Sequence, residues 1–252
     1  MAAIASTPRI PCTTKHTARP VAAPSDAFGH FTAVTVGPKN DQKRFHVYHG
    51  LMCHHSNVFA GMINNNGASS SSSLVLNKVD VEVFSVFFTW MTTNTINVPV
   101  DQSYNSPGWF MLIRVFLFAE EYRIVALRND IIDAFFEKLV QIWVFPMPFI
   151  TELYDMTEQG CTLRDLVVDI CADNMGFGDF PRESEYYPAK FLADVLARFL
   201  ATDEAPRRVH VERDESHSWV TWKRGYLCTE YHVHGCDDLD KKVLAFPENE
   251  SG

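Results

Sequence analysis

The sequence predicts an α+β fold, with a small sheet near the N-terminus, helices around it and an all-helical extension after it. Two observations predict this fold class. Alternation of apolar and polar residues, which is typical of half-buried strands, occurs in short segments within 31–48 and at 74–76. Apolar residues at helical spacing fill most of 81–200 instead. We therefore expect an early sheet followed by many helices.

Length and composition limit the functions that are possible for this chain. The chain has 252 residues, of which 46% are hydrophobic, so it can bury one domain plus an extension, or two small domains. Its formal net charge is −9 and its basic residues form no cluster, which argues against direct binding of nucleic acid. The longest apolar runs are shorter than the ~20 residues that span a bilayer, so no membrane contact is expected. The six cysteines lie far apart, which suits an intracellular, reducing compartment such as cytoplasm or nucleus.

The first elements are expected to be a hairpin and two short helices. Residues 31–36 and 44–48 have strand patterns, and the polar, Gly- and Pro-containing segment 37–42 between them is typical of a turn. At Gly50 the spacing of apolar residues becomes helical, and Ser56 is placed to cap a second short helix. A strand that turns directly into two helices must pack them on itself, so we expect this stretch to nucleate the core.

A loop, a short strand and a central helix follow. Residues 64–73 (NNNGASSSSS) contain almost no apolar side chain, which predicts a flexible loop before a strand at 74–76. Asp80 can cap a helix over 81–91. Because this helix is apolar on nearly every face, we expect other elements to cover it on all sides.

Helices dominate the rest of the chain. We expect them at 109–123, at 124–140, at 148–156, from Thr162 onward and from Pro188 onward. The last of these has an apolar stripe that predicts a buried face, formed by Phe191, Leu192, Val195, Leu196, Phe199 and Leu200. The composition turns polar after 201, and 219–231 is expected to form a hairpin about Arg224–Gly225.

These elements define four segments. We expect a disordered tail rich in Pro, Ser and Thr at 1–29, the domain that holds the sheet at 30–140, a helical extension at 141–201, and an acidic, partly disordered C-terminal region with a Cys/His cluster at 202–252.

Four stretches carry a resemblance to a known family. They are Phe45–Ser56 followed by Phe59; Leu74–Leu76 followed by Asp80, Phe84 and Trp90; Phe116–Tyr122; and Ile124–Asp133 (IVALRNDIID). In these motifs and in their order, the chain resembles the BTB/POZ domain, and more closely the BTB domain proteins of fungi. The resemblance covers roughly 31–140. It implies the BTB/POZ fold, a small mixed sheet flanked by a cluster of helices.

The resemblance also implies a protein-interaction module without catalysis or cofactor. Such domains self-associate, pair with another BTB protein, or tie a substrate-recruiting region to a cullin ubiquitin ligase. The paired charges of dimeric members are missing here, where Tyr48 and His49 replace a family His and a basic residue. The apolar-x-Glu loop of cullin adaptors is missing too, because 64–73 contains no Glu. We expect weak self-association, and candidate partner contacts at Tyr48, His49, Phe59 and Met62.

A cluster near the C-terminus is the candidate metal site. Its residues are Cys228, His232, His234 and Cys236 (CTEYHVHGC). On a strand, all four would face one side, with His232 and His234 ~7 Å apart, too far to share a tetrahedral zinc without a kink. Gly235 can supply such a turn. Zinc binding is one interpretation; a reduced, partly exposed tail is the other.

No motif indicates an enzyme. The sequence lacks G-x-S-x-G, a phosphate-cradling glycine loop and H-E-x-x-H. The hypotheses left open are a substrate adaptor of a cullin ligase, a transcriptional co-regulator acting through protein partners, and a zinc-binding protein. A zinc enzyme is the weakest, because no general base accompanies the Cys/His cluster.

Overall fold

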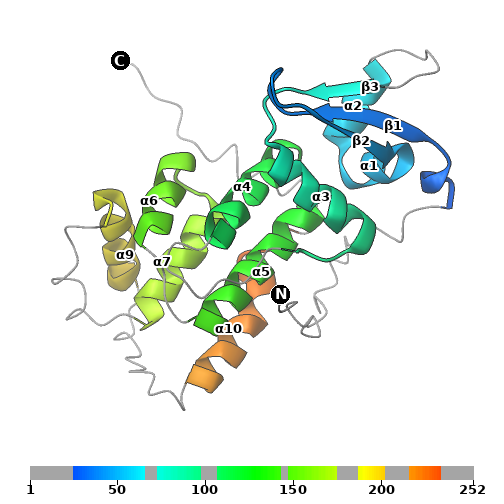
Figure 1. Cartoon of the computed structure of the whole chain (residues 1–252). Coiled ribbons are helices and arrows are strands. Elements are labelled where there is room, and N and C mark those ends of the chain that lie inside the picture. The colour runs from blue at the N-terminus through cyan, green and yellow to red at the C-terminus, as the bar shows by residue number, and fades with distance from the viewer. Residues whose placement is uncertain are drawn as a thin grey trace, which may run out of the picture. The chain divides into compact units, whose positions relative to one another are not determined.

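The computed structural model describes residues 25–65, 73–97, 107–142, 147–174, 187–201 and 216–233. The chain divides into two compact units. Figure 1 labels its helices and strands. The first unit takes in residues up to 99, then 111–134, and those from 233 onward. The second takes in 100–110 and 135–232. Each unit is described by itself below.

The first unit contains a three-stranded mixed sheet of order β2-β1-β3. β1 (Phe31–Val36) pairs antiparallel with β2 (Lys43–Tyr48), which confirms the predicted hairpin. β3 (Ser73–Leu76) pairs with β1 in parallel. Alternation along the strands sends one set of side chains into the core: Val34, Val36, Phe45, Val47, Leu74 and Leu76.

A short 3-10 helix, η1 (Ser25–Phe28), precedes the sheet. The expected disordered tail, 1–29, therefore overlaps an ordered element at Ser25–Phe28, in which Ala27 is buried. Ala27 packs on Gly50 of α1 (His49–His55), where an added Cβ would lie 2.5 Å from the Ala27 Cα. Only glycine allows this approach, so Gly50 is what holds η1 against α1.

Ser56 joins two parts of the first unit. Its hydroxyl accepts a hydrogen bond from the Phe59 N–H at 3.1 Å, which confirms the predicted cap of α2 (Asn57–Asn65). The same hydroxyl donates to the Tyr122 carbonyl at 2.6 Å, just beyond the end of α4 (Pro107–Glu121). A single buried serine thus ties the start of one helix to the end of another.

The central helix is α3 (Val81–Thr93). The Asp80 carboxylate accepts from the backbone N–H groups of Glu82 and Val83 at 2.7 and 3.4 Å, which confirms the predicted cap. Aromatic side chains of α2, α3 and α4 and the residue after α4 meet around it: Phe59, Phe84, Phe87, Phe118 and Tyr122. α4 and α5 (Val125–Ile142) run through both units. The predicted face of α5 is buried, at Leu127, Ile131, Phe135 and Leu139.

The second unit is helical, with α6 (Met147–Met156), α7 (Thr162–Asn174), α9 (Ala189–Ala201) and α10 (Ser216–Glu230). The buried Arg164 of α7 donates to the Tyr154 carbonyl at 2.6 Å and to the Thr157 hydroxyl at 2.5 Å, and it also bonds the Thr157 carbonyl. Its guanidinium stacks 4.2 Å from the centre of the Tyr154 ring. Arg164 therefore satisfies the carbonyls at the end of α6.

The predicted hairpin at 219–231 is wrong, because this segment is the helix α10. Its buried residues, Val220, Lys223, Leu227 and Tyr231, have helical spacing. Polar side chains on this face are paired: Lys223 binds Asp173 at 3.1 Å, and the Tyr231 hydroxyl binds Asp169 at 2.5 Å. Because a lysine and a tyrosine occupy this buried face, the helical spacing of its apolar residues could not be recognised in the sequence.

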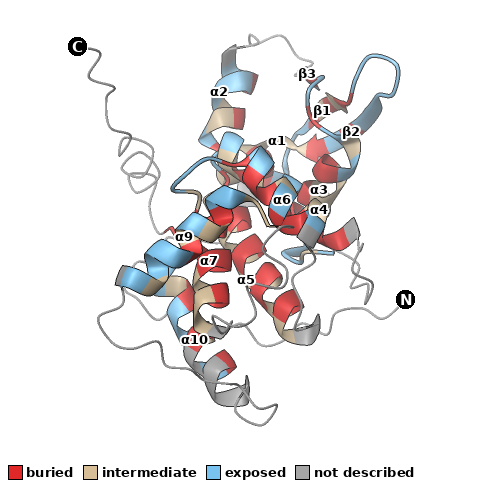
Figure 2. Cartoon of the chain, turned by 90° about the vertical axis from the view of Figure 1, so that its left-hand side faces the viewer, coloured by how far each residue is buried: buried red, intermediate tan, exposed pale blue. Residues whose placement is uncertain are grey.

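The predicted stripe of α9 is only partly buried. Phe191 and Val195 are covered, but Leu196 is 50% exposed and Leu200 is 77% exposed. In Figure 2 most of α9 is pale blue, whereas the described residues of α5 are red and tan. The predicted loops and tails at 1–24, 66–72, 175–186 and 234–252 lie outside the described residues.

Candidate functional site

The outer face of the sheet is the face that the core does not use. Cross-strand pairs place Phe31 beside Tyr48, Ala33 beside His46, and Thr35 beside Arg44. β3 adds Ser73 beside Ala33 and Val75 beside Thr35. Among these outward side chains none is buried, and Phe31, Arg44, His46, Ser73 and Val75 are exposed. α1 and α2 lie against the opposite face (Figure 1).

One end of this outer face is aromatic. Phe28 is 51% exposed and Phe31 is 56% exposed, which is unusual for side chains of this size. Both rings pack on Tyr48: the Phe31 and Tyr48 centroids are 4.4 Å apart, and the Phe28 and Tyr48 centroids are 5.3 Å apart at an edge-on angle of 76°. We call Phe28, Phe31 and Tyr48 the aromatic surface.

The aromatic surface is held by its surroundings. Its parts come from η1, from the first residue of β1 and from the last residue of β2. The His49 N–H donates to the His30 carbonyl at 2.7 Å, and the His49 ring nitrogen Nδ1 lies 3.2 Å from the buried Thr32 hydroxyl. These bonds fix the chain on both sides of the rings, so the rings are presented in a defined arrangement.

The four candidate partner contacts lie in different parts of the first unit and differ in burial. Tyr48 lies in the aromatic surface and His49 borders it, both half-buried. Phe59 is 0% exposed and stacks on Tyr122 with centroids 4.5 Å apart. Its assignment as a partner contact is therefore corrected: it is a core residue, because the apolar positions of α2 turn inward. Met62, further along α2, is 38% exposed.

Sequence reasoning missed Phe28 and Phe31. A signal for Phe31 was available, because β1 alternates and its buried positions are Thr32, Val34 and Val36. A phenylalanine on the other face of the same strand is out of pattern. Phe28 carried no such signal, since it lies in a segment that the sequence assigns to a disordered tail.

The candidate metal ligands are only partly described. Cys228 lies in α10 and His232 lies just beyond its end, whereas His234 and Cys236 fall outside the described residues. Cys228 is disulfide-bonded, while Cys53, Cys161 and Cys171 are free. The expectation of reduced cysteines is therefore wrong for Cys228. A disulfide sulfur is not a thiolate, so zinc binding stays a prediction for the reduced chain, tested by its zinc content against Cys228→Ser.

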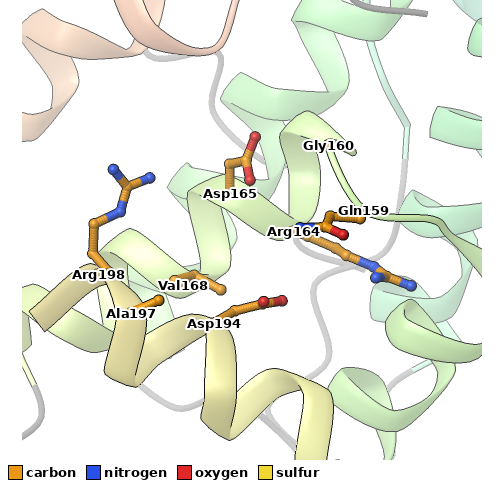
Figure 3. Close-up of a pocket in the computed structure, with 8 residues that line it drawn as sticks. All are labelled: Gln159, Gly160, Arg164, Asp165, Val168, Asp194, Ala197 and Arg198. Carbon is orange, nitrogen blue, oxygen red and sulfur yellow. The ribbon is translucent and has the colours of Figure 1, made fainter. Parts of the chain in front are cut away.

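Other sites in the described part of the chain are weak. No group of three or more His, Cys, Asp and Glu there is arranged to hold a metal ion. An open cleft of about 260 Å³ lies between α7 and α9 (Figure 3). Its charged side chains are already engaged: Arg198 pairs with Asp169 at 2.5 Å, Asp194 accepts from Tyr154 at 2.7 Å, and Arg164 extends away from Arg198 into the α6 contacts. The cleft is therefore not a built ligand site.

A comparison with protein-family models finds one match, to the BTB/POZ domain over residues 26–135. The chain contains a BTB/POZ domain. Its strands and α1 to α4, with most of α5, lie inside the match, as the resemblance in the sequence led us to expect. The BTB/POZ domain is a protein-interaction module, so the aromatic surface lies on a domain whose role is to bind other proteins.

No curated protein matches the chain. None of the described helices is long and apolar enough to cross a membrane.

Proposed function

We propose that the chain is a non-catalytic interaction protein that binds its partner through the aromatic surface of its BTB/POZ domain. One observation carries this proposal: two phenylalanines, each more than half exposed, pack together on one tyrosine at the outer face of the sheet. Leaving such rings in water contributes no free energy to the folded chain alone. A partner that covers them would gain binding free energy from their burial.

The energetics suit an interface hot spot. Burying the open half of a phenylalanine contributes on the order of 1–1.5 kcal/mol, so the two rings together supply about 2–3 kcal/mol. The rings are already packed on Tyr48, so little side-chain freedom remains to be lost when a partner binds.

As the finer role, we propose a substrate adaptor that ties its partner to a cullin ubiquitin ligase inside the cell, in cytoplasm or nucleus. The presence of a BTB/POZ domain, followed by helices with their own buried core, supports an adaptor with more than one surface. The missing Glu in 64–73 counts against the usual cullin contact. Contact with another BTB protein is the alternative for the same surface.

The test is affinity purification of the tagged chain from cells, with the wild type compared with Phe28→Ala/Phe31→Ala. Leu200→Ala is the matched control, since it also truncates an exposed apolar side chain but lies in the second unit. We expect specific partners to be lost from the double variant and kept by the control. Identical partner lists for all three proteins would refute the surface. Blotting for cullins tests the adaptor role, and failure to recover any cullin would refute it.

A further inference from the structure

We propose that the outer face of the sheet binds an acidic, extended segment of a partner protein that carries one large apolar side chain. The aromatic surface would receive the apolar side chain, and Arg44, the cation of β2 that lies on this outer face, would receive a carboxylate. This inference rests on the proposed function and adds the chemistry of the partner.

The charge of the sheet differs from that of the chain. The net charge of the chain is −9, yet none of the residues in β1, β2 and β3 is acidic. Arg44 points outward from β2, is exposed, and forms no ion pair within the described part of the chain. The nearest acid in sequence, Asp41, lies in the hairpin turn between Lys39 and Lys43. A face that has one exposed arginine and no acidic side chain, on a protein of net negative charge, favours a ligand with a carboxylate over a basic one.

The outward residues form consecutive rows. Phe31 and Tyr48 make the aromatic row, Ala33 and His46 the next, and Thr35 and Arg44 the third. Outward residues on one strand are about 7 Å apart, so Arg44 lies roughly 13–14 Å from the aromatic row. An extended peptide covers that distance in about four residues.

The middle of the face has room for a backbone. Ala33 and Thr35 are small and half-buried, while Arg44 and His46 stand on one side of them and Ser73 and Val75 on the other. β2 and β3 are the outer strands of this sheet, so backbone N–H and C=O groups at its edges can also pair with an added strand.

Aromatic and basic side chains together also suit single-stranded nucleic acid. Here the cations facing outward are few and the protein as a whole is acidic, so it repels a phosphate backbone. A peptide with a few carboxylates and one apolar anchor matches the face better. RNA binding is therefore an outcome that the test must detect.

The test is selection of phage-displayed random peptides of about a dozen residues on the full chain. We expect the enriched peptides to carry net negative charge and at least one Phe, Tyr, Trp, Leu or Met. A selected peptide is then labelled, and its affinity is measured by fluorescence anisotropy against the wild type, Arg44→Glu, Phe31→Ala and Lys190→Glu. The last is the matched control, an exposed cation of α9 with the same charge change.

We expect Arg44→Glu and Phe31→Ala each to weaken binding about tenfold or more, and Lys190→Glu to leave it within about twofold. Circular dichroism and a thermal melt check that each variant is folded. Enriched peptides that are neutral or basic, or an Arg44→Glu effect no larger than that of Lys190→Glu, would overturn the inference while leaving the aromatic surface intact. Binding that is insensitive to Phe31→Ala would overturn the proposed function as well. An oligo-uridine RNA that binds more tightly than the peptides and loses affinity in Arg44→Glu would overturn it in favour of nucleic acid.

Discussion

At the scale of single residues, buried polar groups decide local stability. His55 at the end of α1 packs on the Trp90 ring, with centroids 4.9 Å apart, and its Nδ1 atom is buried without a hydrogen-bond partner. Burial, with a smaller contribution from the neighbouring His54, lowers the pKa of His55 to about 4. The neutral ring is thus the form that fits the folded chain.

His55 predicts a loss of stability in mild acid. Its folded pKa is depressed below the unfolded value of 6.5, so between these values only the unfolded chain takes up the proton. The free energy of unfolding should therefore fall as pH drops from 6.5 to about 4 and level off for this group below that. Allowing for solvent around a partly exposed ring, we expect a loss on the order of 1–2 kcal/mol.

Urea denaturation at pH 7 and pH 4.5 measures this effect. His55→Gln should remove much of the difference between the two pH values, whereas His46→Gln, at an exposed position on β2, should retain it. An equal pH dependence in both variants would show that His55 is not the cause.

Arg164 predicts a large cost for a single truncation. Its buried guanidinium bonds the Tyr154 carbonyl and the Thr157 hydroxyl and carbonyl, so Arg164→Met leaves buried acceptors without donors. We expect the free energy of unfolding to drop by about 2–4 kcal/mol. Arg198→Met, whose guanidinium is half exposed, should cost less than about 1 kcal/mol. Chemical denaturation compares the two; similar costs would contradict the structural role of Arg164.

At the scale of elements, sequence reasoning succeeded where local chemistry and period agree. Asp80 and Ser56 are strong caps, and the helices that they begin start where expected. The hairpin followed from clear alternation and a turn of six residues. Sequence reasoning failed for α10. Lys223 and, just beyond the helix, Tyr231 occupy buried positions because their polar groups bind Asp173 and Asp169 of α7. Such pairing across about 50 residues of sequence is invisible in a local pattern.

Substitution of Gly225 tests whether this segment is the helix α10 or the predicted hairpin. This glycine lies inside α10, and an added Cβ would meet nothing within 4 Å. Gly225→Ala should therefore stabilise the chain by about 0.5–1 kcal/mol, since alanine favours a helix. In the hairpin turn expected from the sequence, the same change would destabilise.

Gly160 is the matched control for Gly225. It has the same open space around its Cβ position but a φ of +85°, which alanine adopts only with strain. Gly160→Ala should lower the melting temperature, and Gly225→Ala should raise it. A melting temperature lowered by both changes would contradict a helix at Gly225.

At the scale of the whole molecule, the fold and its family were predictable, but the surface was only partly so. Four motifs identify the domain because apolar positions of the core keep the family pattern, as at Phe45, Val47 and Leu51. Two of the four candidate contacts, Tyr48 and His49, were chosen where that pattern breaks. This criterion found Tyr48 and missed Phe28, because exposure depends on which elements cover a residue and no local spacing records it.

The outer strands of the sheet also bear on self-association. β2 is an open edge, and unpaired edges can join a second copy of the same sheet. Two copies of β2 that pair edge to edge in an antiparallel register centred on Lys43 and Arg44 would bring these cations of one copy close to those of the other. Like charges at such a distance oppose pairing, which is a physical reason to expect weak self-association.

Neutralising the edge should therefore strengthen self-association. We expect the wild type to be mainly monomeric at tens of micromolar by light scattering, and Lys43→Thr/Arg44→Thr to shift measurably toward dimer. Lys190→Thr, which removes an exposed cation from α9, should leave the mass unchanged. High salt should raise the dimer fraction of the wild type, since salt screens the repulsion between exposed cations, and should affect the double variant less. A tight wild-type dimer at these concentrations would contradict the repulsive role of this edge, because it would show that another surface or the edge itself overcomes the charges.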